Sequence, residues 1–364
     1  MTARGRGAPP GSPSPPAARS PPSPPSRSAV VPVFDGARVL PRCLDALAPL
    51  VGGELLEVIV VDDGSGDGSP RLAADRGLAV LSTGGRKGPA AARNVGVEAA
   101  RGEAVLFVDA DVVATPEGVA ALRAALAEPG VVAAFGSYDD DPPERNLASL
   151  YANLRHHHVH QRGAGEASTF WAGFGAVRRD RFRDAGGFDA LRYPRPMIED
   201  IELGYRLRAR GGRIVLVAGA RCRHLKRWTV GSIVRTDLSC RAVPWARLLL
   251  THPQAAAALN VTWGERLRAG LAGLTAASLA APWALGAAGW LVPAALLLTA
   301  GLANRGLVAL VARRGGAGAA AGALLLHQLH YLYSSAAFVA CWLHVRLGAG
   351  RPDPAAVPRR PESP

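Results

Sequence analysis

Two carboxylates separated by one small residue, Asp109-Ala110-Asp111, directly follow the apolar run 104–108. Carboxylate oxygens in such a pair suit Mg²⁺ or Mn²⁺, which can bridge them to the phosphate oxygens of a nucleotide. Asp is also favoured in turns and at helix caps. The pair alone therefore leaves two interpretations open, a divalent-metal site and a solvated turn.

A second acidic pair, Asp62-Asp63, closes the earlier apolar run 55–61 and is followed by a cluster of turn residues. A carboxylate at such a position can accept a hydrogen bond from the N–H of a nucleotide base. Arg93 lies between the two acidic sites, where its guanidinium can pair with a phosphate or a carboxylate. The alternative for Arg93 is the polar face of a helix.

Further candidates lie in the second half of the chain. Glu199 and Asp200 open an Arg-rich helix, where a carboxylate is either a cap stabilised by the helix dipole or a general base for an attacking hydroxyl. His224 follows the strand expected over 213–217, and an imidazole can complete a metal shell begun by a carboxylate. Helical spacing puts His156 and His160 on one face, and without an accompanying carboxylate motif we expect them to pack or face solvent.

The elements that must position these side chains alternate between strands and helices. Apolar runs predict strands over 29–34, 55–61, 78–82 and 104–108, and helical patterns follow over 38–50, 70–76 and 89–101. This alternation predicts an α/β fold with a mostly parallel sheet covered on both faces. Ligands bind at the carboxyl ends of the strands in such sheets, and the acidic pairs fall there.

Apolar residues dominate from 270 to 343, with charges only at Arg305, Arg313 and Arg314. The stretches 270–290, 291–311 and 318–343 each approach the roughly 20 residues that span a bilayer, so two or three transmembrane helices are expected. The alternative is a buried helical subdomain. The net charge is +13, and the strongly basic second half runs into this apolar region. That pattern favours a membrane surface, and not nucleic acid, as the partner.

The remaining composition indicates a cytoplasmic setting. Four cysteines occur without a C-x-x-C pair, so neither a disulfide framework nor a structural zinc site is expected. Residues 1–28 are rich in Pro and Ser and lack the apolar segment of a signal peptide. We expect them to form a disordered tail.

Taken in order along the chain, the motifs resemble those of the family-2 inverting glycosyltransferases of the GT-A fold. The resemblance covers residues 29–245. It is carried by Val31-Pro32-Val33, Val60-Val61-Asp62-Asp63-Gly64-Ser65, Gly88-Pro89-Ala90-Ala91-Ala92-Arg93-Asn94, Phe107-Val108-Asp109-Ala110-Asp111, Gly186-Gly187-Phe188-Asp189, Glu199-Asp200 and His224. Each motif is common alone, and the ordered set makes the resemblance specific.

The resemblance implies donor-side roles for the matching positions. Pro32 and Val33 would line the nucleotide-base pocket, Asp62 or Asp63 would bind the base, and Arg93 would help fix the nucleotide. Asp109, with Ala110 beside it, would face the ribose or the sugar.

The resemblance also implies the metal, the base and the acceptor side. Asp111 and His224 would hold Mg²⁺ or Mn²⁺. Asp200 would be the catalytic base, with Glu199 as the alternative. The segment 170–175 is similar to the family's acceptor-side loop, where Trp171, close to Gly173, would stack on a sugar.

Two segments depart from the family pattern. Phe34-Asp35-Gly36 stands where the family usually has an aromatic residue or Asn after the first strand. His224-Leu225-Lys226-Arg227-Trp228 is similar to the Q-x-x-R-W segment of membrane-bound, often processive members, with His in place of Gln. The second departure favours a metal role for His224 over processive synthesis.

The predicted organisation is a tail over 1–28, a GT-A catalytic domain over 29–225, a basic amphipathic connector at the membrane surface over 226–268, two or three transmembrane helices over 269–345 and a disordered tail over 346–364. We expect the domain to face the cytoplasm at the inner membrane and to transfer a sugar, with inversion, from a nucleotide-sugar donor to a lipid-linked or cell-surface glycan. Three alternatives stay open: a polyprenyl-phosphate glycosyl synthase, a nucleotidyltransferase and a non-catalytic membrane scaffold that retains the fold.

Overall fold

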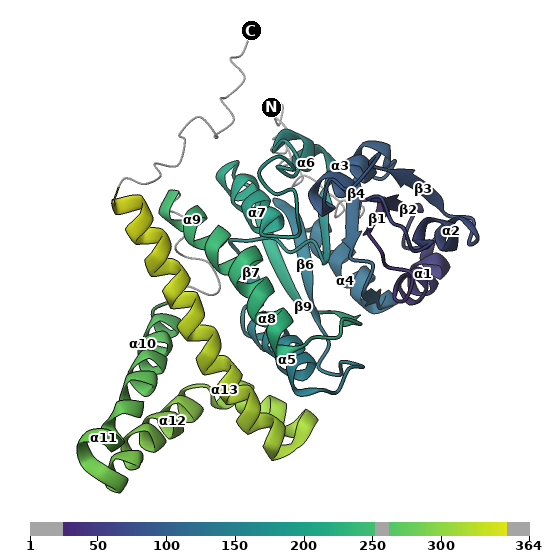
Figure 1. Ribbon diagram of the computed structural model, residues 1–364. Helices are drawn as coiled ribbons and strands as arrows, with labels where there is room; N and C mark the ends of the chain where they lie inside the picture. Colours follow the sequence, from purple (N-terminus) through teal and green to yellow (C-terminus); the bar gives the residue numbers. More distant parts are fainter. Residues whose placement is uncertain (1–24, 252–261, 348–364) are drawn as a thin grey trace, which may run out of the picture.

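The computed structural model describes residues 25–251 and 262–347, which form an α/β domain followed by long apolar helices (Figure 1). The described part of the domain contains one nine-stranded sheet in the order β3-β2-β1-β4-β8-β6-β9-β5, with β7 paired to β9 beside this path. The strands are β1 (Arg27–Val33), β2 (Glu57–Asp62), β3 (Ala79–Ser82), β4 (Ala104–Val108), β5 (Val112–Ala114), β6 (Val131–Tyr138), β7 (Gly165–Ala167), β8 (Phe174–Arg178) and β9 (Arg213–His224). β1 thus begins two residues before the expected boundary at residue 29.

The sheet is mixed, which corrects the expectation of a mostly parallel one. β1 pairs in parallel with β2 and β4, and β2 pairs in parallel with β3, as the strand and helix alternation predicts. β8 then lies antiparallel between β4 and β6, and β5 and β7 both pair antiparallel with β9. The expectation assumed that a helix follows every strand, as parallel crossovers require. In the described part of the chain, no helix lies between β4 and β5 or between β7 and β8, so the regular alternation ends after β4.

Helices cover both faces of the sheet. Leu40, Leu44 and Leu122 bury the apolar sides of α1 and α4 on one face, together with Ala73 of α2. The other face is covered by α3, α6 and α7, which contribute Val97, Phe182, Leu203 and others. These helices are α1 (Leu40–Leu47), α2 (Ser69–Ala74), α3 (Pro89–Ala99), α4 (Pro116–Ala127), α6 (Arg179–Asp184) and α7 (Glu199–Ala209).

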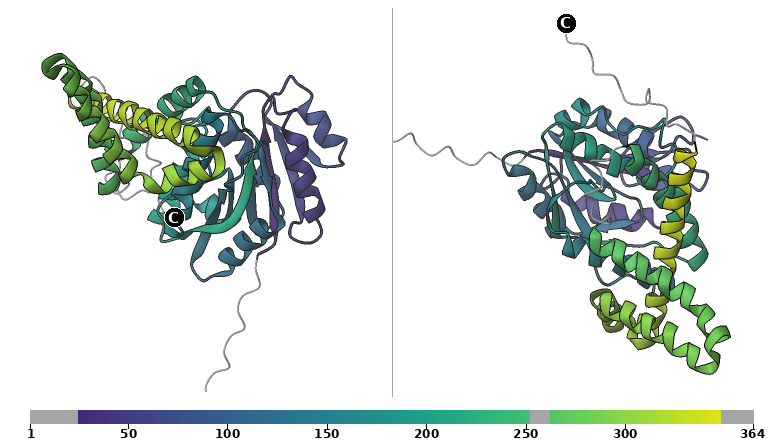
Figure 2. Two further views of the ribbon diagram at one scale, coloured as in Figure 1. Left: turned by 90° about the horizontal axis from the view of Figure 1, so that it is seen from below. Right: turned by 90° about the vertical axis from the view of Figure 1, so that its left-hand side faces the viewer.

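A third group of helices leads away from the sheet. It comprises α5 (Leu147–Arg162), α8 (Val230–Thr236), the π-helical turn η2 (Asp237–Ala242), α9 (Val243–Thr251), α10 (Trp263–Ala277), α11 (Ala281–Leu285), α12 (Leu291–Ala303) and α13 (Arg305–Arg346). Helices α10 to α12 project to one side of the α/β domain, and α13 runs back along it (Figure 2). The expected C-terminal tail lies outside the described residues from 348 onward.

Two helical runs, Trp263–Ala303 and Arg305–Arg346, are long and apolar enough to cross a membrane by length and composition. In the first run most large apolar side chains are exposed, including Trp283 at 87% and Leu291 at 72%. The second run contains a kink at Gly316, whose φ of 82° is easily adopted by glycine. Of the two or three spans expected, the described residues therefore offer two candidate runs.

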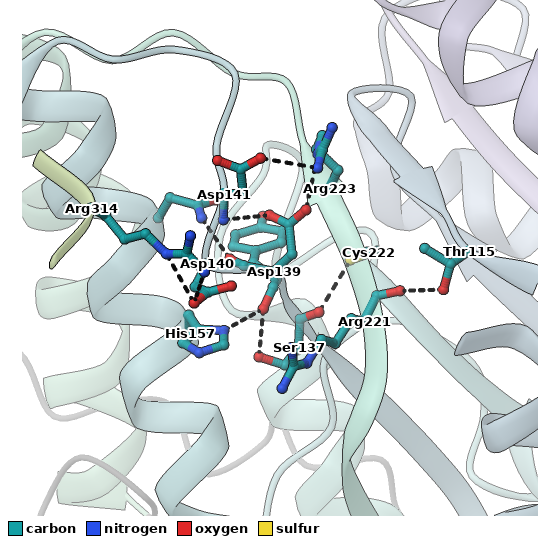
Figure 3. A network of polar contacts seen from close by, with 12 residues as sticks. Thr115, Ser137, Asp139, Asp140, Asp141, His157, Arg221, Cys222, Arg223 and Arg314 are labelled. Atoms are coloured by element: carbon teal, nitrogen blue, oxygen red, sulfur yellow. Dashed lines mark hydrogen bonds and ion pairs between the residues drawn. The ribbon is translucent and has the colours of Figure 1, made fainter. Parts of the chain in front are cut away.

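Helix α5 joins the α/β domain to α13. Its residues Leu150, Tyr151 and Leu154 share a buried cluster with Leu310 and Val311 of α13. At the same junction Arg314 of α13 forms an ion pair of 2.5 Å with Asp140 in the loop after β6. Figure 3 shows this loop, whose neighbouring Asp139 and Asp141 both bind Arg223 of β9. The C-terminal helices are thus tied to the strands β6 and β9.

Candidate functional site

The sheet brings the predicted acidic strand ends together from distant parts of the chain. The backbone N–H of Asp109 donates to the carbonyl of Gly173 over 3.1 Å, which ties the end of β4 to the segment before β8. The N–H of Leu225 donates to the carbonyl of Asp111 over 2.8 Å. Because β5 pairs Val112 with His224, Asp111 and the end of β9 lie side by side.

Arg93 bridges two of the predicted site carboxylates. Its Nη2 lies 2.7 Å from Oδ1 of Asp109, and its Nη1 lies 2.9 Å from Oε1 of Glu199. Arg93 is 5% exposed. Burial alone would lower the pKa of this guanidinium, but Asp109 and Glu199 raise it above its usual value. The charged pairing fixes the end of β4 against the start of α7 and leaves Glu199 committed to Arg93.

Asp200 differs from its neighbour Glu199 because, in the part of the chain that the structure describes, its carboxylate forms no ion pair. Its Oδ2 accepts from the N–H of Ala172 over 3.0 Å, and its Oδ1 accepts from its neighbour Ile201 over 2.8 Å. Burial, followed by the negative charge of Glu199, raises the pKa of Asp200 to about 7. A carboxyl that titrates there can act as a general base near neutral pH.

The segment around Asp200 is supported from the connector. Leu248 of α9 packs with Tyr193 and Ile198, the residues that lead into α7. This loop also lies against Gly88, where a Cβ would come within 2.4 Å of the carbonyl oxygen of Pro194. Gly88 has φ of 91°, so both the close approach and the backbone angle require glycine.

Asp111 and His224 are placed so that both could bind one divalent metal ion. Oδ2 of Asp111 lies 3.5 Å from Nε2 of His224. Two ligands bound at about 2.1 Å to one ion lie roughly 3 to 3.5 Å apart. Burial opposes ionisation of Asp111, but His224 and then Lys226 hold the pKa of its carboxyl below the usual value.

No group of three or more His, Cys, Asp or Glu side chains in residues 25–251 and 262–347 is arranged to hold a metal. The fit at Asp111 and His224 therefore leaves the other ligand positions to oxygens from outside the protein. Phosphate oxygens and water are the usual partners of Mg²⁺ in such incomplete sites.

The carboxylates of Asp62 and Asp63 accept hydrogen bonds from the loops around them. Asp62 accepts from the N–H groups of Gly64 and Ser65. Asp63 accepts from the N–H groups of Lys87 and Gly88 and from the hydroxyl of Thr83. These bonds shape the loop between β2 and α2 and the turn before α3.

The other predicted donor-side residues surround these loops. Val33 is buried in the core, and Pro32 is half-buried beside it in β1. Ala110 is half-buried against the same core. The exposed ring of Phe34 lies 4.2 Å from the guanidinium carbon of Arg86. Phe34 and Arg86 thus form a polar and aromatic rim beside the end of β1.

A cavity of about 290 Å³ opens beside Asp111. It is lined by Asp35, Gly36, Arg38, Val39, Asp111, Lys226 and Arg227. Three cations and a metal-ligand candidate face the same space, which suits a diphosphate. Lys226 and Arg227 carried a signal in the sequence only through the segment 224–228, and Arg38 carried none, because it lies in a helical pattern with no motif around it.

The predicted acceptor-side segment, 170–175, contacts both Asp109 and Asp200. Trp171 directly precedes Ala172 and Gly173. The N–H of Ala172 donates to the carboxylate of Asp200, and the carbonyl of Gly173 accepts from the N–H of Asp109. The Trp171 ring is half-buried and lies across Gly173. Tyr138 contacts it edge-on, with ring centroids 5.0 Å apart. Tyr138 carried no signal in the sequence, because a single Tyr at a strand end is common.

Removal of the bridging guanidinium should destabilise the domain. Arg93→Met leaves Asp109 and Glu199 without their cation, and we expect a loss of about 3–5 kcal/mol in the free energy of unfolding. Denaturation in detergent, followed by tryptophan fluorescence, measures the change. The control is Arg101→Met, which breaks a pair with Glu57 from an arginine that is 72% exposed and should cost at most about 1 kcal/mol. Equal losses for the two variants would contradict the bridging role.

The architecture is that of the GT-A fold. The chain is similar in fold to the mannosyltransferase PcManGT from Pyrobaculum calidifontis, whose solved structure is a complex with GDP-Man and Mn²⁺. The TM-score is 0.59 at 23% identity, and the likeness covers 89% of each chain. Residues 28–186 match the model of Glycosyl transferase family 2. This segment, the greater part of the α/β domain, is thus a family-2 glycosyltransferase segment.

Relatives of known sequence match smaller parts of the chain than the PcManGT structure does. The pre-mycofactocin glycosyltransferase of Mycobacterium tuberculosis is 28% identical over 254 residues, which is 65% of this chain and 50% of the relative. The TPR repeat-containing protein Synpcc7942_0270 of Synechococcus elongatus is 38% identical over 101 residues, which is 28% of this chain and 24% of the relative. The chain thus spans half or less of the length of these two relatives.

Proposed function

We propose that the protein is an inverting, metal-dependent glycosyltransferase that moves a sugar from a nucleotide-sugar donor to a hydroxyl of a lipid-linked or cell-surface glycan. The observation that carries the proposal is the meeting of two different carboxylate sites at one sheet edge. Asp111 lies with His224 beside a cationic cavity, whereas Asp200 is half-buried and its pKa is raised to about 7. This separation of roles is what a single displacement needs.

In the proposed reaction Asp200 takes the proton of the acceptor hydroxyl as that oxygen attacks the anomeric carbon of the donor. Arg38, Lys226 and Arg227 stabilise the negative charge on the departing diphosphate from the cavity beside Asp111. Asp111 and His224 would hold the divalent ion, Mg²⁺ or Mn²⁺, and the ion would supply further charge neutralisation to the diphosphate. Arg93 keeps Asp109 in place at the donor side.

The proposed location is the cytoplasmic face of the inner membrane. The exposed apolar side chains of Trp263–Ala303 support a multi-pass anchor, because such a surface is unfavourable in water. The connector helices α8 and α9 expose Arg235 and Arg247, which suit anionic lipid headgroups. An anchored catalytic domain has direct access to acceptors held in the same bilayer, which supports a lipid-linked or surface glycan.

A donor screen tests the proposed function. The purified protein in detergent is incubated with Mn²⁺ or Mg²⁺ and a set of nucleotide sugars, with GDP-mannose first because PcManGT is seen with it. We expect metal-dependent release of a nucleoside diphosphate with one donor. Release of pyrophosphate would instead identify a nucleotidyltransferase, and failure to bind any nucleotide sugar in the presence of Mn²⁺ would favour the scaffold.

A further inference from the structure

The His-rich segment of α5 contacts the end of β6 through hydrogen bonds and ring packing. Nδ1 of His157 lies 2.8 Å from the carbonyl oxygen of Tyr138, and Nδ1 of His160 lies 2.9 Å from that of Gly136. Figure 3 shows His157 reaching from α5 towards the end of this strand. The ring of His156 packs on the ring of Tyr138 with centroids 4.1 Å apart. Both the backbone and the side chain of Tyr138 are therefore held by α5.

Tyr138 in turn lies against the metal-ligand candidate. Its ring is stacked on that of His224 at 4.3 Å with only 8° between the planes. His156 is also in contact with Tyr138 and with Trp171, at 4.5 Å. A ladder of rings, in the order His224, Tyr138 and His156, thus extends from the candidate metal site to α5.

The stacking of Tyr138 on His224 takes the place of the hydrogen bond that usually orients a metal-ligating His. A metal-ligating His almost always donates its second ring N–H to a carboxylate, a carbonyl or water, which fixes the orientation of the ring. Within the described part of the chain, the imidazole of His224 has no such partner: its polar contact is with Asp111, the other ligand candidate. Flat stacking on Tyr138 restricts the ring to one plane and leaves Nε2 directed at Asp111.

We propose that Tyr138, clamped by the histidines of α5, is a positioning residue that orients His224 for metal binding. This inference rests on the proposed function, because it assumes that His224 is a metal ligand. It assigns a role to the segment 156–160, which the reaction itself does not use. It also means that the metal site depends on α5, whose other face packs on α13.

The test measures Mn²⁺ binding directly and does not use turnover. Free Mn²⁺ is quantified by electron paramagnetic resonance during titration of the full chain in the presence of GDP or UDP. Tyr138→Leu should raise the Kd for Mn²⁺ about 10–100-fold, the range found for residues that orient metal ligands. Tyr138→Phe keeps the stacked ring and should stay close to the wild-type Kd. The matched control, His158→Leu, alters an α5 residue that faces Gly306 of α13 and should also leave the Kd unchanged.

Two further measurements separate positioning from general damage. Electron spin echo modulation from the imidazole nitrogen on bound Mn²⁺ should be present in the wild type and Tyr138→Phe and weakened in Tyr138→Leu. In a His224→Ala background, Tyr138→Leu should cause no additional loss of affinity. If Tyr138→Leu does not fold, His156→Leu removes the outer ring of the ladder and should raise the Kd in the same direction by a smaller factor.

The possible failures are distinguishable. Suppose that the wild type binds Mn²⁺ and shows nitrogen modulation. If a folded Tyr138→Leu or His156→Leu variant then has the same Kd and the same modulation, the positioning role alone is overturned. The same holds if Tyr138→Leu weakens binding equally with and without His224. A wild type that binds no Mn²⁺ with either nucleotide would contradict the metal site of the proposed function, and this inference would fall with it.

Discussion

Replacement of Asp200 by Asn is expected to lower kcat by about 10²–10⁴-fold, the usual contribution of a positioned general base. The amide keeps the size of the side chain and its contact with Ala172, but it cannot accept the proton of the acceptor hydroxyl. Donor and metal binding should change little, since neither Arg93 nor Asp111 is bound by Asp200. Steady-state kinetics with the donor found in the screen measure the effect. Glu202→Gln, on the same helix and paired with Arg206, is the control and should retain activity.

The same carboxyl should set the pH dependence. Its pKa of about 7 means that Asp200 is mostly protonated below pH 7 and ionised above it. A protonated base cannot act, so the rate should rise with pH through about 7 and then level off, with a roughly tenfold fall per unit below pH 6. This limb should disappear in Asp200→Asn. Full turnover by Asp200→Asn would instead favour a polyprenyl-phosphate acceptor, which needs no strong base.

Replacement of Asp111 by Asn is expected to abolish metal-dependent turnover, with a loss of at least about 10²-fold. The ion contributes several kcal/mol of charge stabilisation at the diphosphate, and a factor of ten in rate corresponds to 1.36 kcal/mol. Excess Mn²⁺ should recover only part of the rate, because His224 alone remains as a protein ligand. Removal of the metal from the wild type by a chelator should give a loss of similar size, reversed by Mn²⁺.

The Asp111 prediction needs a stability control. The side chain of Asp111 is 28% exposed, and within the described residues its ion-pairing contact is with the His224 imidazole alone, so folding should be affected less than activity. Asp45→Asn, at a surface pair with Arg76, should leave both unchanged. An Asp111→Asn variant that is fully active at ordinary metal concentrations would contradict the metal assignment.

Much of the donor side of the fold follows from the order of apolar runs and turns. Val58 to Val61 and Leu106 to Val108 are continuous apolar strands, and each ends at an Asp. Because β1 to β4 are parallel, their carboxyl ends meet at one edge, as predicted. For residues 28–186, the match to the family model confirms the predicted family and class of enzyme. The roles of individual site residues stay predictions.

The remaining features depend on contacts that local patterns do not encode. The start of β8 falls within the segment 170–175 that was expected to form the acceptor-side loop, yet tertiary packing makes β8 an antiparallel strand between β4 and β6. The partners of Arg93 lie 16 and 106 residues away, so its role as a bridge was invisible along the chain. The stacking of Tyr138 on His224 arises because β6 and β9 are neighbours, which no periodicity predicts.

The stereochemistry of transfer tests the central claim most directly. Asp200 as base and a cationic diphosphate site beside Asp111 require one direct displacement, which inverts the anomeric carbon. We predict that proton NMR of the product of an α-linked nucleotide sugar shows a β-linked sugar from the first turnover. A product that retains the α configuration would contradict a single displacement driven by Asp200.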